Sequence, residues 1–441
     1  MTATAATATV LAAAIRDGET SSVDLVRACL ERCDAVESMI GAWACLDAEL
    51  ALAQARQRDQ ARQAGTPMGP LHGLPVGIKD IFDTVDMPTE NGTVLHAGRR
   101  PGWDATAVTR LRAAGAVVMG KTVTTELASR HPGKTRNPHA PEHTPGGSSS
   151  GSAAAVGAGM VPLAIGSQTN GSVIRPASYC GVCGFKPTHG LISRYGMLRH
   201  SRHLDHVGVF ARSVEDLALI AETLAGYDDK DPDCRLQSPP ALLSTALQDF
   251  PLAPKFAWIP TPAWRHAGAD LKDGFAELLQ HLGDAVDEAE LPEPFGEAYD
   301  WHRVIVEADL ARSFAKEYER GREHLSATLR EAIERGRRQF AVDYNRAVDG
   351  IAVLNAVLAD VFEWHDVVLT PATAGEAPRG LDSTGDPVFC TPWTLCGMPA
   401  LTLPLLQGKN GLPIGVQLVA PRGDDGRLLR AARWLMASIA E

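Results

Sequence analysis

A serine-rich loop and a second serine downstream are the first candidates for chemistry in this chain. The loop reads HTPGGSSSGSAAAVGAG over residues 143–159 and leads into an alanine-rich run. Further along, TNGSV places Ser172 directly after an Asn-Gly pair, whose residues tolerate unusual φ angles and can aim successive backbone amides into one pocket. A serine needs a base to become a nucleophile, and N–H donors must stabilise the oxyanion that forms. These residue types are compatible with acyl transfer by one of the two serines, provided that a base lies close by.

Two other uses of the loop are weaker. The sequence GGSSSG fits neither glycine-rich phosphate-binding pattern, and a formal P-loop match at residues 115–122 is made of strand-forming residues instead of a glycine-rich cradle. Apolar segments flank the loop on both sides, which argues against a flexible linker. A catalytic placement of the serines is therefore favoured.

Lys79 ends the apolar run GLPVGIK, and a lysine can act as a base only in its neutral form. An ordinary lysine is neutral only about 0.04% of the time at pH 7. Burial beside Val76 and Ile78 can lower its pKa, and activity is then expected to rise above neutral pH as the amine loses its proton. Taken alone, a lysine paired with Asp80 at a strand end is the more ordinary interpretation.

Taken together, these motifs resemble the amidase signature family of Ser-cisSer-Lys amide hydrolases. The likeness covers nearly the whole chain through GIKD, GGSSSGSAAAVGAGM, TNGSVIRPASYCG, LDHVGVFARSVEDLA and GLPIGVQLVA, and LDSTGDP looks closest to the malonamidase-like branch. The resemblance implies that Ser172 is the nucleophile and Lys79 the base. It also implies that Ser148 bridges them, with a cis peptide bond to Gly147.

The same resemblance implies further site residues. It assigns the oxyanion hole to the backbone amides of Thr169, Asn170, Gly171 and Ser172. Arg175 resembles a group that holds a substrate carboxylate, which suits a guanidinium with two parallel N–H donors, although a structural ion pair is an equal alternative. His206 is a candidate for lining the substrate site.

The implied activity is hydrolysis of the C–N bond of small amides through an acyl-serine intermediate, with carbamates and esters left open as substrates. No metal or organic cofactor is implied. One alternative is an amidotransferase A-type subunit that works with a partner chain, and another is a non-catalytic binding scaffold. Relatives often form dimers, so a homodimer also remains open.

Other constellations of reactive residues are less favoured. His200, His203 and His206 lie near Asp205, but a histidine triad is defined by geometry, and a fourth metal ligand is not evident. The Cys180–Cys183 pair has zinc-ribbon spacing without a second pair, so we expect ordinary reduced cysteines and no metal site.

Charge and hydropathy limit the partners and the location. The 441 residues carry a net charge of −11, which argues against nucleic acid or an anionic membrane as a partner. The N-terminus lacks the basic region of a signal peptide, and no long apolar run occurs, so a cytoplasmic location is expected.

Alternating strand and helix patterns predict an α/β fold, and the family resemblance implies a mixed central sheet covered by helices on both faces. The expected organisation is a single domain over residues 1–441, with a catalytic core at 70–215. Residues 260–361 read as a helical elaboration that shapes the substrate pocket.

Overall fold

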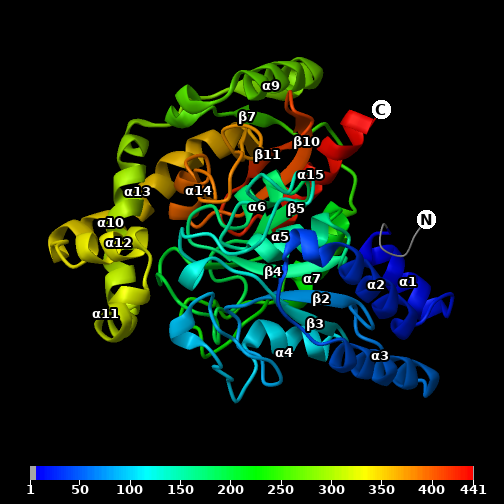
Figure 1. Cartoon of the computed structure of the whole chain (residues 1–441). Coiled ribbons are helices and arrows are strands. Elements are labelled where there is room, and N and C mark those ends of the chain that lie inside the picture. Colours follow the sequence, from blue (N-terminus) through cyan, green and yellow to red (C-terminus); the bar gives the residue numbers. More distant parts are fainter. Residues whose placement is uncertain (1–5, 441) are drawn as a thin grey trace.

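One mixed β-sheet of eleven strands runs through the computed structural model, which describes residues 6–440 (Figure 1). The strand order is β1-β3-β2-β4-β6-β5-β10-β11-β9-β7-β8. The strands are β1 (Trp43–Leu46), β2 (Pro75–Lys79), β3 (Val117–Thr122), β4 (Leu163–Gln168), β5 (Cys183–Lys186), β6 (His206–Ala211), β7 (Phe256–Trp258), β8 (Val286–Glu288), β9 (Val367–Pro371), β10 (Ala400–Gln407) and β11 (Pro413–Val419).

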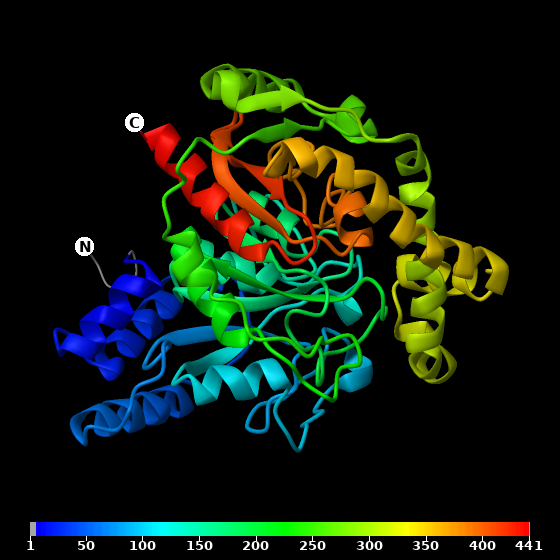
Figure 2. The same cartoon turned by 180° about the vertical axis from the view of Figure 1, so that it is seen from behind.

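Helices cover both faces of this sheet. Helices α5 and α6 pack on one face, and α7, α8 and α15 pack together on the other, as seen from behind in Figure 2. The predicted α/β fold with a mixed, helix-covered sheet is confirmed. The helices are α1 (Ala8–Asp17), α2 (Ser22–Ile40), α3 (Ala48–Gln63), α4 (Thr106–Ala113), α5 (Ser150–Gly157), α6 (Ile174–Tyr179), α7 (Val214–Leu224), α8 (Leu242–Ala246), α9 (Ala269–Leu282), α10 (Ala298–Ser313), α11 (Ala315–Gly321), α12 (Ala327–Gly336), α13 (Ala341–Trp364), α14 (Thr391–Leu395) and α15 (Asp425–Ala440).

The central strands β2 and β4 bring the candidate residues to one edge of the sheet. They are parallel neighbours, with Ile78 opposite Ile165, and every residue of both strands is buried. The carboxyl ends of parallel strands meet at the same edge, where α/β proteins usually place their sites. Lys79 ends β2, and the turn that carries Ser172 follows β4 directly.

A helical layer lies beyond the end of the sheet. Helix α10 packs on α12, on α13 and on α14 (Figure 1). The segment 260–361 is mostly helical, as predicted, and also contains the short strand β8. Within residues 6–440, no helix has both the length and the hydrophobicity needed to cross a bilayer.

The close approach of α5 to the neighbouring strands depends on a glycine. The amide of Gly151 donates to the carbonyl of Val123 at 2.9 Å, and a Cβ atom at this position would lie 2.2 Å from the carbonyl oxygen of Ala42. No real Cβ atom approaches backbone so closely, so any larger residue must push the helix away from the sheet.

We therefore expect Gly151→Ala to lower the free energy of unfolding by about 3 kcal/mol, since overpacking forces the backbone to shift. Thermal or urea unfolding followed by circular dichroism measures the loss. Gly296→Ala is the matched control, because no heavy atom lies within 4 Å of the added Cβ. Equal stability of the two variants would contradict this account of the α5 packing.

Candidate active site

Lys79 lies fully buried at the end of β2, between two serine hydroxyls. Its Nζ atom is 2.7 Å from Ser148 Oγ and 2.8 Å from Ser167 Oγ, and its side chain has no exposed surface. Burial lowers the pKa of Lys79 well below its usual value, and the carboxylate of Asp205 opposes this shift. A neutral amine beside a hydroxyl can accept its proton.

The ordinary alternative, a pair between Lys79 and Asp80, is wrong. The Asp80 carboxylate instead pairs with buried Lys121 at 3.2 Å, and Lys121 also donates to Thr89 Oγ1 at 2.6 Å. Lys121 belongs to the formal P-loop match, which here forms the strand β3. Because Asp80 is paired with Lys121, the Lys79 amine is free to bond with Ser148 and Ser167.

The other hydroxyls of the serine-rich loop bond to backbone, which singles out Ser148. Ser149 Oγ donates to the carbonyl of Ser167 at 3.2 Å, and Ser150 Oγ donates to the carbonyl of Gly146 at 2.9 Å. The peptide bond between Gly147 and Ser148 is cis, as the resemblance implied. Ser148 is therefore the member of the run whose hydroxyl contacts the lysine.

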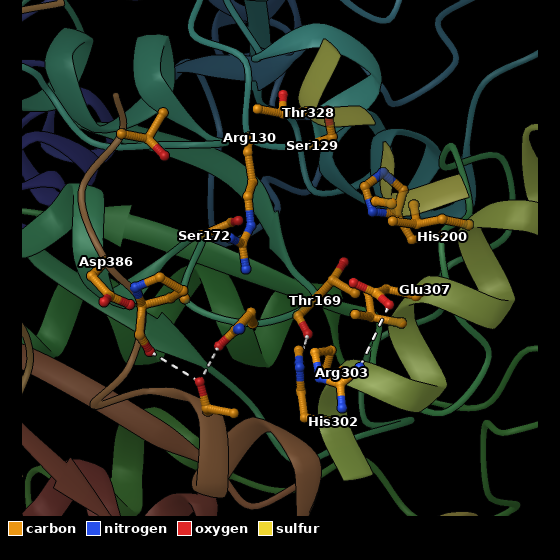
Figure 3. Close-up of a pocket in the computed structure, with 18 of the residues that line it drawn as sticks. Ser129, Arg130, Thr169, Ser172, His200, His302, Arg303, Glu307, Thr328 and Asp386 are labelled. Carbon is orange, nitrogen blue, oxygen red and sulfur yellow. Dashed lines mark hydrogen bonds and ion pairs between the residues drawn. The ribbon is translucent and has the colours of Figure 1, made fainter. Parts of the chain in front are cut away.

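Ser172 stands on the wall of the main pocket, a cavity of about 830 Å³. Figure 3 shows it at the base of this pocket, on the turn between β4 and α6. Within the described chain, no hydrogen bond joins Ser172 to Ser148. Transfer of a proton between them therefore requires the two hydroxyls to approach when a substrate is bound.

The carbonyl groups of the turn before Ser172 are fixed by side chains from distant segments. His302 Nε2 donates to the carbonyl of Thr169 at 2.9 Å, and Thr394 Oγ1 donates to the carbonyl of Asn170. Burial lowers the pKa of His302 to about 4, so the ring is neutral near pH 7 and carries its proton on Nε2 to serve this carbonyl. These contacts fix the orientation of both peptide planes.

The amides of the turn are left without protein partners. In a trans peptide the N–H points opposite to the carbonyl, so those of Asn170 and Gly171 point away from His302 and Thr394. Across residues 6–440, the amides of Asn170, Gly171 and Ser172 donate no hydrogen bond to the protein. Together with their place on the pocket wall, this suits them to a developing oxyanion.

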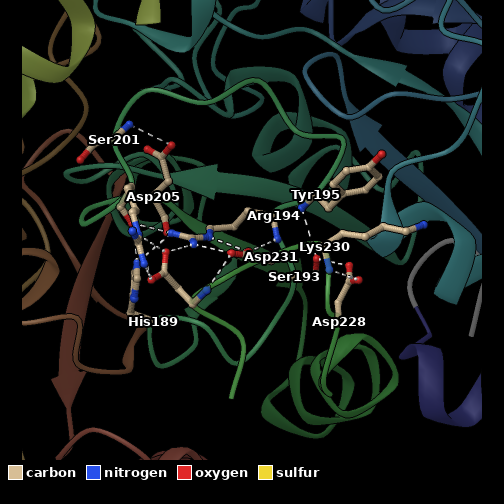
Figure 4. Close-up of polar contacts among 11 residues, drawn as sticks. His189, Ser193, Arg194, Tyr195, Ser201, Asp205, Asp228, Lys230 and Asp231 are labelled. Atoms are coloured by element: carbon tan, nitrogen blue, oxygen red, sulfur yellow. Dashed lines mark hydrogen bonds and ion pairs between the residues drawn. The ribbon is translucent and has the colours of Figure 1, made fainter. Parts of the chain in front are cut away.

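The side chain of Thr169 is fixed by Asp205. Thr169 Oγ1 donates to Asp205 Oδ1 at 2.7 Å, and the other carboxylate oxygen accepts the amides of His200 and Ser201. Figure 4 shows the Arg194 network that supports this segment: Arg194 binds Asp231 at 2.6 Å and the carbonyl of Arg202 at 2.6 Å.

Sequence reasoning missed the residues that brace this turn. His302 and Thr394, which bond the turn, come from α10 and α14 and carry no local motif, and the same holds for Ser167 of β4, which accepts from Lys79. Only the antiparallel register of β4 with β6, which sets Gln168 opposite His206, puts the 205–206 segment beside the turn. These contacts depend on tertiary packing, for which the sequence has no short-range signal.

Arg175 and His206 lie in different surroundings. Arg175 lines the pocket, is 4% exposed, and donates to the carbonyl of Gly147 at 2.6 Å and to Thr384 Oγ1 at 3.1 Å. His206 does not line the pocket, and its Nδ1 bonds the carbonyl of Leu204 while its ring packs edge-on against His189. His206 is thus buried outside the lining of this cavity, and its place in the substrate site stays a prediction.

The histidines and cysteines do not cluster as a metal site. Within residues 6–440, no group of three His, Cys, Asp or Glu side chains could hold a metal ion. His200 Nε2 bonds the carbonyl of Leu127, whereas Cys180 and Cys183 are buried free thiols. The pocket itself is lined by hydroxyl, backbone amide, guanidinium, imidazole and carboxylate groups, and the Lys79 amine lies behind its wall, beside Ser148.

Comparison with known proteins agrees with this chemistry. The sequence model of the family described as Amidase matches residues 24–429. The chain belongs to the amidase family, whose members hydrolyse C–N bonds. It is similar to the A-type subunit of the glutamyl-tRNA(Gln) amidotransferase from Lachnospira eligens, with 33% identity and 96% of each chain covered. The corresponding subunit from Chloroflexus aurantiacus is 34% identical, over 96% of this chain and 94% of that one.

Solved structures of this family share the fold. The peptide amidase of Stenotrophomonas maltophilia superposes with a TM-score of 0.86 and 29% identity, over 99% of this chain and 97% of that one. A chain described as part of a vestigial protein complex, which reveals the origins of an s-triazine catabolic enzyme, gives a TM-score of 0.92 and 29% identity, over 98% of each chain. These comparisons show both the family of this chain and its fold.

The buried lysine has a measurable effect on stability. In the unfolded chain Lys79 titrates near its ordinary value, about 10.4, and in the folded chain well below it. Between these two values only the unfolded state holds the proton, so the lysine makes the folded protein more stable as pH rises and less stable as pH falls.

We expect Lys79→Met to remove this dependence. The stability of the wild type relative to the variant should grow by about 1.4 kcal/mol for each pH unit within that window. Urea unfolding of both proteins at pH 7.5, 8.5 and 9.5 measures the difference. A difference that does not change with pH would mean that Lys79 is not buried in its neutral form.

Proposed function

We propose that this amidase hydrolyses small amides through an acyl intermediate on Ser172, with Ser148 and Lys79 as the proton relay. The observation that carries the proposal is the buried amine of Lys79, 2.7 Å from Ser148 Oγ and without an ion-pair partner within residues 6–440. A neutral amine there has a lone pair that can accept a proton. Ser172 lines the pocket, next to backbone amides that donate to no acceptor within residues 6–440.

In the first step Ser172 Oγ bonds to the amide carbon as its proton passes to Ser148, whose own proton passes to Lys79 Nζ. The carbonyl oxygen becomes an oxyanion, which the amides of Asn170, Gly171 and Ser172 stabilise by hydrogen bonds that strengthen with the charge. Lys79 becomes an ammonium ion. Its burial makes this state costly, so it returns the proton readily.

The proton then returns through Ser148 to the nitrogen of the leaving group, and the C–N bond breaks. Ammonia or an amine departs, and the acyl group remains on Ser172. Water repeats the attack with the same relay, which releases the carboxylic acid and restores the serine. The balance is one amide and one water converted to one acid and one amine.

The motifs LDSTGDP and SVIRPASYCG support a finer placement in the malonamidase-like branch, as a member that acts on small acidic amides. Carbamates and esters have the same carbonyl geometry at the reacting carbon and remain alternative substrates. The partner in this proposal is a small molecule. A net charge of −11 disfavours nucleic acid and anionic membrane surfaces.

A second candidate is the A-type subunit of an amidotransferase, which works with a partner chain. The favouring observation is the likeness to A-type subunits of glutamyl-tRNA(Gln) amidotransferases over 94–99% of this chain. Turnover of amides by the purified chain alone supports the hydrolase, whereas activity that emerges only with a co-purifying partner supports the amidotransferase.

Labelling with a fluorophosphonate tests the nucleophile. We expect wild-type protein to gain one phosphonyl group on Ser172 by mass spectrometry, and Ser172→Ala to lose both labelling and turnover. Ser150→Ala is the matched control, since that hydroxyl bonds to the Gly146 carbonyl and faces away from the relay. Retained turnover in Ser172→Ala would exclude the acyl-serine mechanism, and an unlabelled wild type would favour a non-catalytic scaffold.

The pH dependence of kcat/KM for a neutral amide tests the base. The neutral amine is the active form, so the rate should rise with pH along one limb and then level off. Since burial lowers the pKa of Lys79 well below its usual value, the plateau should begin below the pH range in which an ordinary lysine titrates. A rate that keeps rising through pH 10 would show that the base is an ordinary solvated lysine.

A further inference from the structure

Gln168 is a buried polar side chain beside the nucleophile that the mechanism does not use. It ends β4, directly before the turn on the pocket wall, and is 1% exposed. Its Oε1 atom accepts the amides of Val173 at 2.8 Å and Ile174 at 3.0 Å, and its Nε2 atom donates to Thr394 Oγ1 at 2.9 Å. One side chain thus joins the two ends of the 169–172 turn and connects them to α14.

We propose that Gln168 is a positioning residue for the amides that stabilise the oxyanion. It fixes the direction of the Thr394 hydroxyl, and that hydroxyl holds the Asn170 carbonyl. The N–H of the same peptide, which belongs to Gly171, then points into the cavity. This inference rests on the proposed acyl-Ser172 function and adds to it a residue that acts without touching the substrate.

The orientation of the Gln168 carboxamide follows from its partners. Two backbone N–H groups need an acceptor, so the oxygen faces Val173 and Ile174 and the NH2 group faces Thr394. A hydroxyl has a single proton to donate. Because Thr394 Oγ1 accepts from Gln168, its own proton goes to the Asn170 carbonyl. The hydrogen bonds therefore run in one direction, from β4 through α14 to the turn.

The Thr394 hydroxyl has an alternative that Gln168 disfavours. In a helix, threonine divides between two rotamers, because its hydroxyl can also donate to a carbonyl of the preceding turn of its own helix. The N–H donor of Gln168 favours the rotamer that faces the 169–172 turn. The side chain of Gln168 thus determines where the proton of Thr394 points.

Helix α14 holds Asn170 at a second point. Thr391, one helical turn before Thr394, donates from Oγ1 to Asn170 Oδ1 at 2.9 Å. The backbone and the side chain of Asn170 are therefore fixed by one helix, which Gln168 connects to the strand that leads into the turn. Such bracing suits a peptide that must already be oriented when the oxyanion forms.

The variant Gln168→Glu separates the donor of this side chain from its acceptor. A carboxylate has the same shape and can still accept both backbone amides, but it donates no hydrogen bond and attracts the Thr394 proton away from Asn170. We expect kcat for a neutral amide, measured on the pH plateau, to fall about 100-fold, as when an oxyanion donor is lost. KM should change less than about 3-fold, because the lost interaction belongs to the transition state.

Two substitutions of Thr394 test the same chain without adding a charge. Thr394→Val keeps the shape but removes the hydroxyl, so its kcat should also fall about 100-fold. Thr394→Ser keeps a hydroxyl at the same place and should retain most of the wild-type rate. This pair decides the matter if Gln168→Glu does not fold, since equal rates in Thr394→Val and Thr394→Ser would overturn the proposal.

A trifluoromethyl ketone gives a readout that a merely structural role would not move. Ser172 Oγ bonds to its carbonyl carbon, the serine proton passes through Ser148 to Lys79, and the carbonyl oxygen becomes an oxyanion. We expect the inhibition constant in Gln168→Glu and Thr394→Val to rise by about the factor by which kcat falls. Wild-type kcat in Gln168→Glu, or a lower kcat with unchanged inhibition, would overturn the proposal.

Two substitutions elsewhere are matched controls. Gln54 is a buried glutamine that accepts the amide of Val118 and donates to its carbonyl, both at 3.1 Å, and Thr402 is buried with no partner for Oγ1 within residues 6–440. Neither lines the cavity. Gln54→Glu and Thr402→Val, checked for folding by circular dichroism, should match the wild-type kinetics. A loss in them as large as in the test variants would contradict a specific role for Gln168.

The outcome for Gln168 is distinguishable from the outcome for the proposed function. If wild-type Ser172 is labelled by the fluorophosphonate and neutral amides are cleaved, the function stands even when Gln168→Glu and Thr394→Val behave like the wild type. An unlabelled Ser172 in the wild type defeats the function itself, and this inference with it.

Discussion

A lysine that is fully buried with two hydroxyls as neighbours is the constraint on which the rest of this site depends. Within residues 6–440, no carboxylate lies close enough to Lys79 to form an ion pair, because Lys121 takes the adjacent Asp80. Burial without an ion pair lowers the pKa of Lys79 and so favours the neutral form that a general base requires. The sheet makes this possible, since β2 is a central strand whose residues are all buried.

The turn before Ser172 is also arranged in advance for the reaction, through the orientation of its peptide dipoles. Backbone amides can serve an oxyanion only if the protein satisfies the carbonyls of the same peptides and leaves the N–H groups unused. His302 and Thr394 do this for Thr169 and Asn170. Folding already orients these dipoles, so the peptides need no reorganisation when the oxyanion forms.

The sequence could predict the parts of this site that lie within continuous motifs. Lys79 and the Ser148 loop follow from local residue types together with a family resemblance, and the mixed α/β fold follows from the alternation of strands and helices. The pairing of Asp80 with Lys121 could not be foreseen, because it depends on which strand lies beside β2. His302 and Thr394 were missed because single polar residues without a motif acquire such contacts only when distant segments pack together.

The helical layer beyond the sheet contacts both the turn before Ser172 and the cavity wall. Helix α10 supplies His302, which orients the Thr169 peptide, and α12 begins just after Ser326, whose amide donates to the carboxylate of Glu126. These two helices pack directly on each other. A movement of this layer would therefore disturb the Thr169 peptide and the cavity wall formed by α10 and α12 together. A segment without any catalytic motif thus contacts both the turn before Ser172 and the space in which a ligand would lie.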